Sequence, residues 1–196
     1  MSPVRIDHVI YATTDLDAAA ARVASVLGLT AIPGGRHQGH GTHNRIVPLG
    51  GGYLELMAIA DPEEAAGSPL GSAVQERLAA RGDGLFAWCI AVDDLEPVAD
   101  RLDLEITTIA REGLTARLTG VVEALRNPVL PFFIQRDEGV PDPGDGGDAG
   151  GISWVEVAGD RDGLEHRLGE AELPVRMGEG PVGVVAMGIG QRELRI

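Results

Sequence analysis

The sequence contains no lysine, a single cysteine and few aromatic residues. All 16 basic residues are arginine, which excludes a Schiff-base lysine and the lysine of a phosphate-binding Walker loop. The lone Cys89 has no partner for an intrachain disulfide, and the apolar run around it, FAWCIAV, indicates a buried and inert thiol. Aromatic residues make up only 4% of the chain, so the core must consist mainly of Val, Leu, Ile and Ala.

Positive charge is also scarce, and the formal net charge is −14. A field of that sign repels phosphates and anionic lipids, so neither nucleic acid nor a membrane is an expected partner. No apolar stretch reaches about 18 residues, and the N-terminus lacks a basic region followed by a long apolar run. We therefore expect a soluble cytoplasmic protein, whose 196 residues allow one sizeable core or two small ones.

The first 60 residues carry the clearest pattern. A strand rich in β-branched residues over 4–12 is followed by apolar residues at helical spacing, with Thr14 as the expected N-cap and Gly28 as the stop. Residues 33–44 form a predicted loop rich in Gly and His. Strands are expected over 45–49 and 53–59, and alternation places Tyr53, Glu55 and Met57 on one face of the latter.

The remainder of the chain alternates between further predicted strands and helices. A polar connection precedes a helix that begins at Ser68–Pro69 and ends at Gly82. Strands follow over 85–92, 105–110, 116–120, 130–135 and 152–157, with helices over 95–102 and 163–168 and two or three strands over 174–196. The segment 138–151, EGVPDPGDGGDAGG, has low complexity and predicts a linker or an exposed crossover.

Three segments are similar to one another. HVIYATTDLDAAAARV aligns with AWCIAVDDLEPVADRL, and more weakly with SWVEVAGDRDGLEHRL. Each begins with a strand, an acidic turn and a helix, and each is followed by about three strands. We therefore predict an α+β fold of paired βαβββ modules that form a cupped, curved mixed sheet with helices outside, plus a shortened third copy. The predicted division, all within one compact domain, is a first module over 1–60, a connecting helix over 61–83, a second module over 84–137, a linker over 138–151 and a partial third module over 152–196.

This pattern resembles the vicinal oxygen chelate superfamily, which includes glyoxalase I, extradiol dioxygenases and bleomycin-resistance proteins. The chain is more similar to the glyoxalase-like domain family within it. The stretches IDHVIYATTDLDAA, GGRHQGHGTHN, GGYLELMAI and LPFFIQRD carry the resemblance. It covers nearly the whole chain, and it is strongest over residues 1–140.

The resemblance implies metal ligands on the first and last strand of each module, converging in the cup of the sheet. In the first module these positions hold His8 and Glu55, an imidazole and a carboxylate that suit a divalent metal. In the second module Ala87 cannot ligate, and Gln135 offers only a neutral carbonyl oxygen. The expected metal ligands are therefore His8, Glu55 and Gln135, an open site of two or three protein groups. The third copy places Glu193 at the position of Glu55, either in the cup or simply closing the last strand.

The loop over 33–44 and the adjoining strand supply the other candidates. We expect Glu55 and His43 to act in catalysis, and we expect His37, Thr42, Asn44, Tyr53 and Gln135 to contact the substrate at the pocket mouth. The glycines of GGRHQGHG do not indicate a phosphate site, because no helix follows them.

Three interpretations remain open on these residues: two functions for the cup, and a vestigial cup in a domain that serves oligomer contacts. The first is an enzyme that uses a divalent metal, such as a lyase, isomerase, epimerase or dioxygenase, in which the metal stabilises an enediolate or oxyanion. The second is a metal-free protein that binds or sequesters a small molecule, as the drug-sequestering branch of the superfamily does. His8 with Glu55 favours the first, and Ala87 with Gln135 favours the second. A small-molecule ligand is expected in either case, and a homodimer is compatible with both.

Overall fold

The computed structural model describes residues 4–111, 114–137 and 139–195. The first module comprises β1 (Arg5–Ala12), α1 (Leu16–Leu27), β2 (Ile32–His37), β3 (Thr42–Pro48) and β4 (Tyr53–Ile59). Two helices follow, α2 (Pro62–Ala66) and α3 (Pro69–Arg81). The second module comprises β5 (Gly84–Ala91), α4 (Glu96–Leu102), β6 (Ile106–Arg111), β7 (Leu114–Thr119), α5 (Val121–Arg126) and β8 (Phe132–Arg136).

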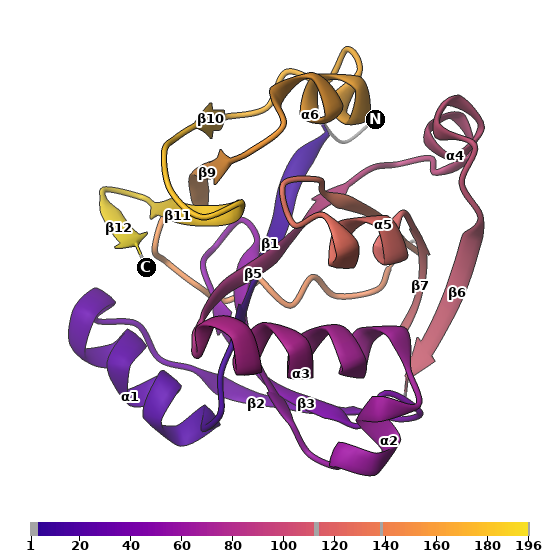
Figure 1. Cartoon of the computed structure of the whole chain (residues 1–196). Coiled ribbons are helices and arrows are strands. Elements are labelled where there is room, and N and C mark those ends of the chain that lie inside the picture. Colours follow the sequence, from indigo (N-terminus) through magenta and orange to yellow (C-terminus); the bar gives the residue numbers. More distant parts are fainter. Residues whose placement is uncertain (1–3, 112–113, 138, 196) are drawn as a thin grey trace.

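The two modules form one eight-stranded sheet in the order β2-β3-β4-β1-β5-β8-β7-β6. In each module the first strand pairs in parallel with the last, β1 with β4 and β5 with β8. The modules join where β1 and β5 run antiparallel side by side, with Ile10 opposite Ala87. This mirrored order brings the first strands of both modules to the centre of the sheet (Figure 1).

Local sequence explains where the first helix begins and ends. The side chain of Asp15 caps α1 by accepting hydrogen bonds from the backbone N–H groups of Asp17 and Ala18. Asp15 is thus the N-cap, one residue beyond the predicted Thr14. Gly28 ends the helix in the left-handed conformation, at φ 66°, which glycine adopts without steric cost.

The segment predicted as a loop over 33–44 is mostly a β-hairpin. β2 continues to His37 and β3 already begins at Thr42, so only a four-residue turn separates them. Glycine and proline obscured the strand pattern at this sheet edge, where such residues are tolerated. The hairpin orders the histidine-rich segment and fixes which face each of its side chains occupies.

The two faces of the main sheet are covered by different elements. We call the face that carries His8 and Glu55 the inner face. The helices α1 and α4 pack on the opposite, outer face, as predicted for helices outside the sheet. The helices α3 and α5 instead pack on the inner face, where Val74 and Ala124 join an apolar cluster with Ile10, Met57 and Ala87. Part of the cup is therefore filled by the chain itself, and Figure 1 shows α3 lying across the sheet.

A second sheet lies on the outer side. Its elements are β9 (Ile152–Ala158), α6 (Arg161–Leu168), β10 (Val175–Met177), β11 (Gly183–Ile189) and β12 (Arg192–Arg195). The strand order is β10-β9-β11-β12, and β9 pairs in parallel with the strand that directly follows its helix. This order differs from that of the two modules, so the topology gives no support to a third copy of the module. The apolar side chains of this sheet share one core with the outer face of the main sheet.

Among the helices of the described residues, none has the length and apolarity needed to cross a membrane.

Candidate functional site

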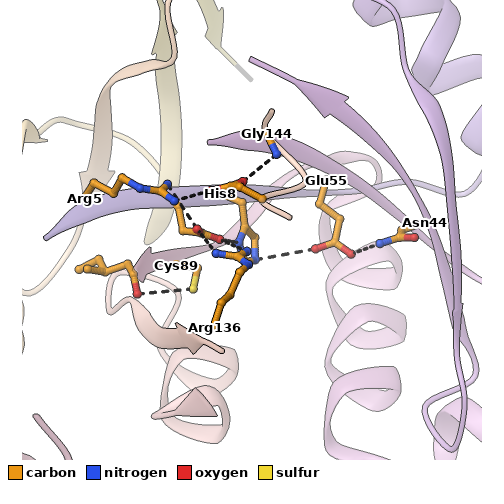
Figure 2. Close-up of polar contacts among 10 residues, drawn as sticks. Arg5, His8, Asn44, Glu55, Cys89, Arg136 and Gly144 are labelled. Carbon is orange, nitrogen blue, oxygen red and sulfur yellow. Dashed lines mark hydrogen bonds and ion pairs between the residues drawn. The ribbon is translucent and has the colours of Figure 1, made fainter. Parts of the chain in front are cut away.

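His8 and Glu55 meet on the inner face near the centre of the sheet. Strand register places Ile10 opposite Glu55 on the parallel pair β1 and β4, and His8 is in phase with Ile10. The Nε2 atom of His8 lies 3.8 Å from Oε2 of Glu55, and the two residues are only 4% and 6% exposed. Figure 2 shows the two side chains pointing toward each other. The sequence thus predicts a contact between side chains 47 positions apart, and the structure contains it.

Glu55 is held from its other side by the β2–β3 hairpin. Nδ2 of Asn44 donates a hydrogen bond of 2.5 Å to Oε1 of Glu55, and Oδ1 of Asn44 accepts one of 2.7 Å from the N–H of Gly35. A Cβ atom at Gly34 would lie 2.0 Å from Oδ1 of Asn44, so only glycine leaves room for this amide. The hairpin therefore fixes one carboxylate oxygen and leaves the other directed at His8.

His37 also contacts the held oxygen of Glu55. Its Nε2 atom lies 3.6 Å from Oε1 of Glu55, and its Nδ1 atom is 2.8 Å from the hydroxyl of Thr42. The side chain of His37 is 18% exposed, compared with 8% for Glu55. His37 thus connects the buried carboxylate to the protein surface, and the structure brings Asn44, Thr42 and His37 together beside Glu55.

Asp7, which the sequence analysis missed, lies against the far side of His8. Its Oδ2 atom is 2.7 Å from Nδ1 of His8, and both of its oxygens accept hydrogen bonds from Arg136, at 2.5 and 2.8 Å. Burial disfavours the charge on Asp7, but the bonds from Arg136 and His8 outweigh it and hold the pKa of Asp7 well below its ordinary value. Burial likewise opposes the charge on Arg136, yet Asp7 raises the pKa of Arg136 above its usual range.

A β-bulge explains why alternation did not reveal Asp7. The pairing of β1 with β5 shifts register between Ile6 and His8. Asp7 is therefore an extra residue on β1, and its side chain is fully buried although its neighbour faces the inner side. No sequence motif marks a bulge of this kind. An aspartate directly before a histidine on a strand nevertheless indicates a possible hydrogen-bond partner for that histidine.

Aromatic rings flank His8, Tyr53 from the first module and Phe132 from the second. The rings of His8 and Tyr53 stack with centroids 4.6 Å apart, and Phe132 presents an edge at 5.4 Å. Burial, reinforced by the charges of Asp7 and Glu55, raises the pKa of Tyr53 well above its ordinary value. The phenol of Tyr53 is thus uncharged and lines the site beside His8.

The second module contributes no ligand at the matching positions. The sequence repeat aligns Ile10 with Cys89. Ile10 pairs with Glu55, and Cys89 pairs with Phe132. Phe132 therefore occupies the position that Glu55 holds in the first module, and Ala87 occupies that of His8. The half of the site on this side is apolar.

Gln135, which the sequence analysis matched with Glu55, lies elsewhere. Its Oε1 atom accepts hydrogen bonds from the N–H of Leu95 and from Arg117, each at 3.2 Å. These contacts place the amide beside the start of α4, on the outer face, and not beside His8. The sequence analysis matched Gln135 with Glu55 because Gln135 is the nearby polar residue of β8. The residue that corresponds to Glu55 in the strand register is the apolar Phe132.

His43 also falls on the other side of the sheet. Thr42, Asn44 and Ile46 alternate onto the inner face of β3, and Ile46 is opposite Glu55. His43 shares the outer face with Arg45, which contacts Asp17 of α1. The structure thus separates His43 from Glu55, whereas the sequence prediction combined them in catalysis. Glu193 lies on β12 of the second sheet, where it binds Arg195.

The donor set fits a divalent metal ion at His8 and Glu55. Metal–nitrogen and metal–oxygen distances of about 2.0–2.2 Å sum to about 4.0–4.3 Å, and the two donor atoms are 3.8 Å apart. One ion can therefore contact both. The Nδ1 side of the imidazole is bound to a carboxylate, the arrangement that metal-binding histidines usually show.

A second cluster, Asp7 with His8 and Cys89, has potential ligand atoms within 4.8 Å of one another. It is less suited to a metal, because Asp7 already neutralises Arg136. Burial also raises the pKa of Cys89 well above its ordinary value, which keeps it a thiol.

A family model described as a glyoxalase-like domain matches residues 6–171. The chain belongs to the glyoxalase-like domain family. Its match spans both modules, the linker, β9 and α6, so the vicinal oxygen chelate fold and the predicted curved mixed sheet of the α+β class are confirmed. The strands β10 to β12 lie beyond the matched residues.

Solved structures support the same fold for this glyoxalase-like protein. A hypothetical protein from Staphylococcus aureus superimposes with a TM-score of 0.68 at 16% identity, over 92% of this chain and 88% of that one. The Streptomyces coelicolor methylmalonyl-CoA epimerase in complex with 2-nitronate-propionyl-CoA gives 0.54 at 20% identity, over 68% of this chain and 98% of the epimerase. A methylmalonyl-CoA epimerase with methylmalonyl-CoA and NH4+ gives 0.53 at 21% identity, over 72% and 100%. A comparison with curated proteins gives no match.

Proposed function

We propose that this glyoxalase-like protein is an enzyme that moves a proton next to a carbonyl group of a small, oxygen-rich substrate, with His8 and Glu55 as the residues that would hold its metal ion. The observation that supports this proposal most is the buried approach of Nε2 of His8 to Oε2 of Glu55, at 3.8 Å. When the imidazole of His8 is neutral and Nε2 carries no proton, Nε2 and Oε2 of Glu55 both have lone pairs that face each other. The space between these two atoms therefore suits a cation. The structural likeness to epimerases that bind CoA esters agrees with a substrate carrying a carbonyl next to an acidic C–H.

His8 and Glu55 would hold a divalent metal ion in this proposal. When bound, such an ion polarises a substrate carbonyl and stabilises the oxyanion that develops there. The protein residues supply the rest of the site. Tyr53 and Phe132 exclude water from the reacting atoms, which strengthens electrostatic interactions between them. His37, linked to Glu55 and partly exposed, is placed to exchange protons with solvent.

A metal-free binding protein is the second candidate. The apolar residues Ala87 and Phe132 favour it, because they replace the ligands of the second module with a surface that suits shape recognition. In that case His8 and Glu55 would orient a ligand by hydrogen bonds. The two candidates predict different metal contents for the same protein.

The deciding experiment measures metal content and its effect on stability. Protein purified without chelator should contain about one divalent ion per chain, and added Zn2+, Mn2+ or Co2+ should raise its melting temperature, because a ligand that binds only the folded state stabilises it. His8→Ala and Glu55→Gln should abolish both effects. His43→Ala is the matched control, since this histidine lies on the outer face, and it should behave like the wild type.

Catalysis is tested separately with α-substituted thioesters, including methylmalonyl-CoA, in deuterated water. The enzyme proposal expects deuterium incorporation at the carbon next to the carbonyl, and its loss in Glu55→Gln. If no metal binds and no exchange occurs while such compounds still raise the melting temperature, the binding protein becomes the better account. A dependence on His43 in place of His8 would reject the site itself.

A further inference from the structure

The strongest contacts in this region lie on the side of His8 that faces away from Glu55. Asp7 is fully buried and accepts two hydrogen bonds from Arg136, a residue of the second module, and it also contacts Nδ1 of His8 at 2.7 Å. Figure 2 shows Arg136 beside His8, with Glu55 on the other side of the ring. The imidazole thus lies between two carboxylates: Asp7 is paired with Arg136, and Glu55 is bound by Asn44 through one oxygen and faces His8 with the other.

This arrangement determines which ring nitrogen of His8 carries the proton. A carboxylate that receives a two-point contact from a guanidinium is ionised and can only accept hydrogen bonds. Nδ1 of His8 must therefore be the donor in its contact with Asp7. In a neutral imidazole the proton then resides on Nδ1, and the lone pair resides on Nε2, the atom that faces Glu55.

We propose that Asp7, held by Arg136, is the positioning residue of the site: it fixes His8 in the Nδ1–H tautomer and directs the lone pair of Nε2 toward Glu55. This inference rests on the proposed function only in that His8 is taken to use Nε2 toward a ligand. It also assigns a role to the second module. That module supplies no ligand, but its Arg136 holds the carboxylate that orients the ligand of the first module.

Arg5 extends the network to the linker. Its guanidinium contacts Asp142 in the linker and lies 3.4 Å from Oδ1 of Asp7. The backbone of the linker is bound in turn to the β3–β4 turn, where the N–H of Gly50 donates to the carbonyl of Gly144 at 3.0 Å. The first strand, the last strand of the second module and the linker therefore meet at Asp7.

The first test determines the tautomer in the wild-type protein. Ring 15N and 1H chemical shifts of 15N-histidine-labelled protein, with His8 assigned through His8→Gln, report which nitrogen is protonated. The proposal expects a proton on Nδ1 of His8, donated to the carboxylate of Asp7. A proton on Nε2 with Nδ1 unprotonated would overturn it. This measurement requires neither metal nor activity, so it remains decisive if the proposed function fails.

The second test perturbs the positioning pair. In Asp7→Asn only one side-chain oxygen remains, and the charged Arg136 is expected to take it and turn the amide N–H2 toward Nδ1 of His8. The ring proton should then move to Nε2, and affinity for Co2+, followed by its absorption spectrum, should fall about 10–100-fold, the usual cost of losing such a partner. Arg136→Lys keeps the charge but loses the two-point contact, and it should give a smaller loss.

Glu96→Gln is the matched control, because it breaks the ion pair of Glu96 with Arg117 away from the site. It should leave the His8 tautomer and Co2+ affinity unchanged. If Asp7→Asn keeps both the Nδ1–H tautomer and wild-type affinity, Asp7 has no positioning role. If the wild type shows the expected tautomer but binds no Co2+, the metal-dependent function fails and the positioning inference stands. If Asp7→Asn does not fold, the ring shifts of His8 in the wild type and the Co2+ affinity of Arg136→Lys still test the proposal.

Discussion

At the scale of single residues, the site consists of two fixed groups, each with one atom left available. Asp7 contacts Nδ1 of His8, so Nε2 is available to a ligand. Asn44 and His37 contact Oε1 of Glu55, so Oε2 is available. Side chains held in this way lose little conformational freedom when a ligand binds, which is the physical basis of preorganisation. The available atoms are the two that face each other.

Asp7 should make the folded state sensitive to acid. Its pKa is lower in the folded protein than its ordinary value of 3.8, so its stabilising effect is present above that value and is lost as the pH falls toward the folded pKa. Asp7→Asn should therefore lower the free energy of unfolding by about 3–5 kcal/mol at pH 7, since it leaves Arg136 buried without its counter-charge. Below about pH 4 the difference between the two proteins should narrow. Denaturant titrations at pH 7, 5 and 3 measure this, and a constant difference would contradict it.

At the scale of elements, the β2–β3 hairpin determines the position of Glu55. Gly34 allows β2 to approach Asn44 closely enough for its amide to be held between the backbone N–H of Gly35 and the carboxylate of Glu55. The same glycines made this segment look like a loop in the sequence. The feature that hid the strand is thus the one that positions the site.

Gly34→Ala should disturb this element. The added methyl group would overlap Oδ1 of Asn44, 2.0 Å from the ideal Cβ position, and overpacking of this kind costs about 1–3 kcal/mol. We expect that loss of unfolding free energy in denaturant titrations, accompanied by weaker Co2+ binding. Gly67→Ala is the control, because its nearest atom is 3.4 Å away and its φ of −84° suits alanine. Equal stability of the two variants would refute the steric argument.

Several elements were predictable from the sequence because their periodicity is strong. Alternation along β1 and β4 suffices to place His8 and Glu55 on one face. It fails at Asp7, because a bulge interrupts the alternation. The prediction for Gln135 came from matching the repeated segments, and that match disagrees with the strand register. The helices α2 and α5 were missed because five or six residues are too few to show a helical period.

At the scale of the whole molecule, the C-terminal sheet is an integral part of the core. Val155, Val184 and Met187 belong to the same apolar cluster as Val9, Leu54 and Trp88 of the main sheet. Its strands β10 to β12 lie outside the residues that the family model matches. The part of the outer face that α1 and α4 leave uncovered is packed against this additional layer.

Met187→Ala should show that dependence. Met187 has no exposed surface, and truncation of a buried methionine costs about 2–5 kcal/mol. Val182→Ala, at a side chain that is 50% exposed, should change the free energy of unfolding by no more than about 0.5 kcal/mol. Thermal or denaturant unfolding should show one transition for both variants. A separate early transition in Met187→Ala would mean that the C-terminal sheet melts independently of the modules.

The antiparallel contact of β1 with β5 joins two halves of a pseudo-symmetric sheet within one polypeptide. In an assembly of identical subunits every substitution appears on both sides of the twofold axis at once. Here the two halves can differ, and the matching positions hold an imidazole and a carboxylate in one half and a methyl and a phenyl group in the other. Covalent linkage thus allows one continuous sheet to present different side chains on the two sides of its pseudo-twofold axis.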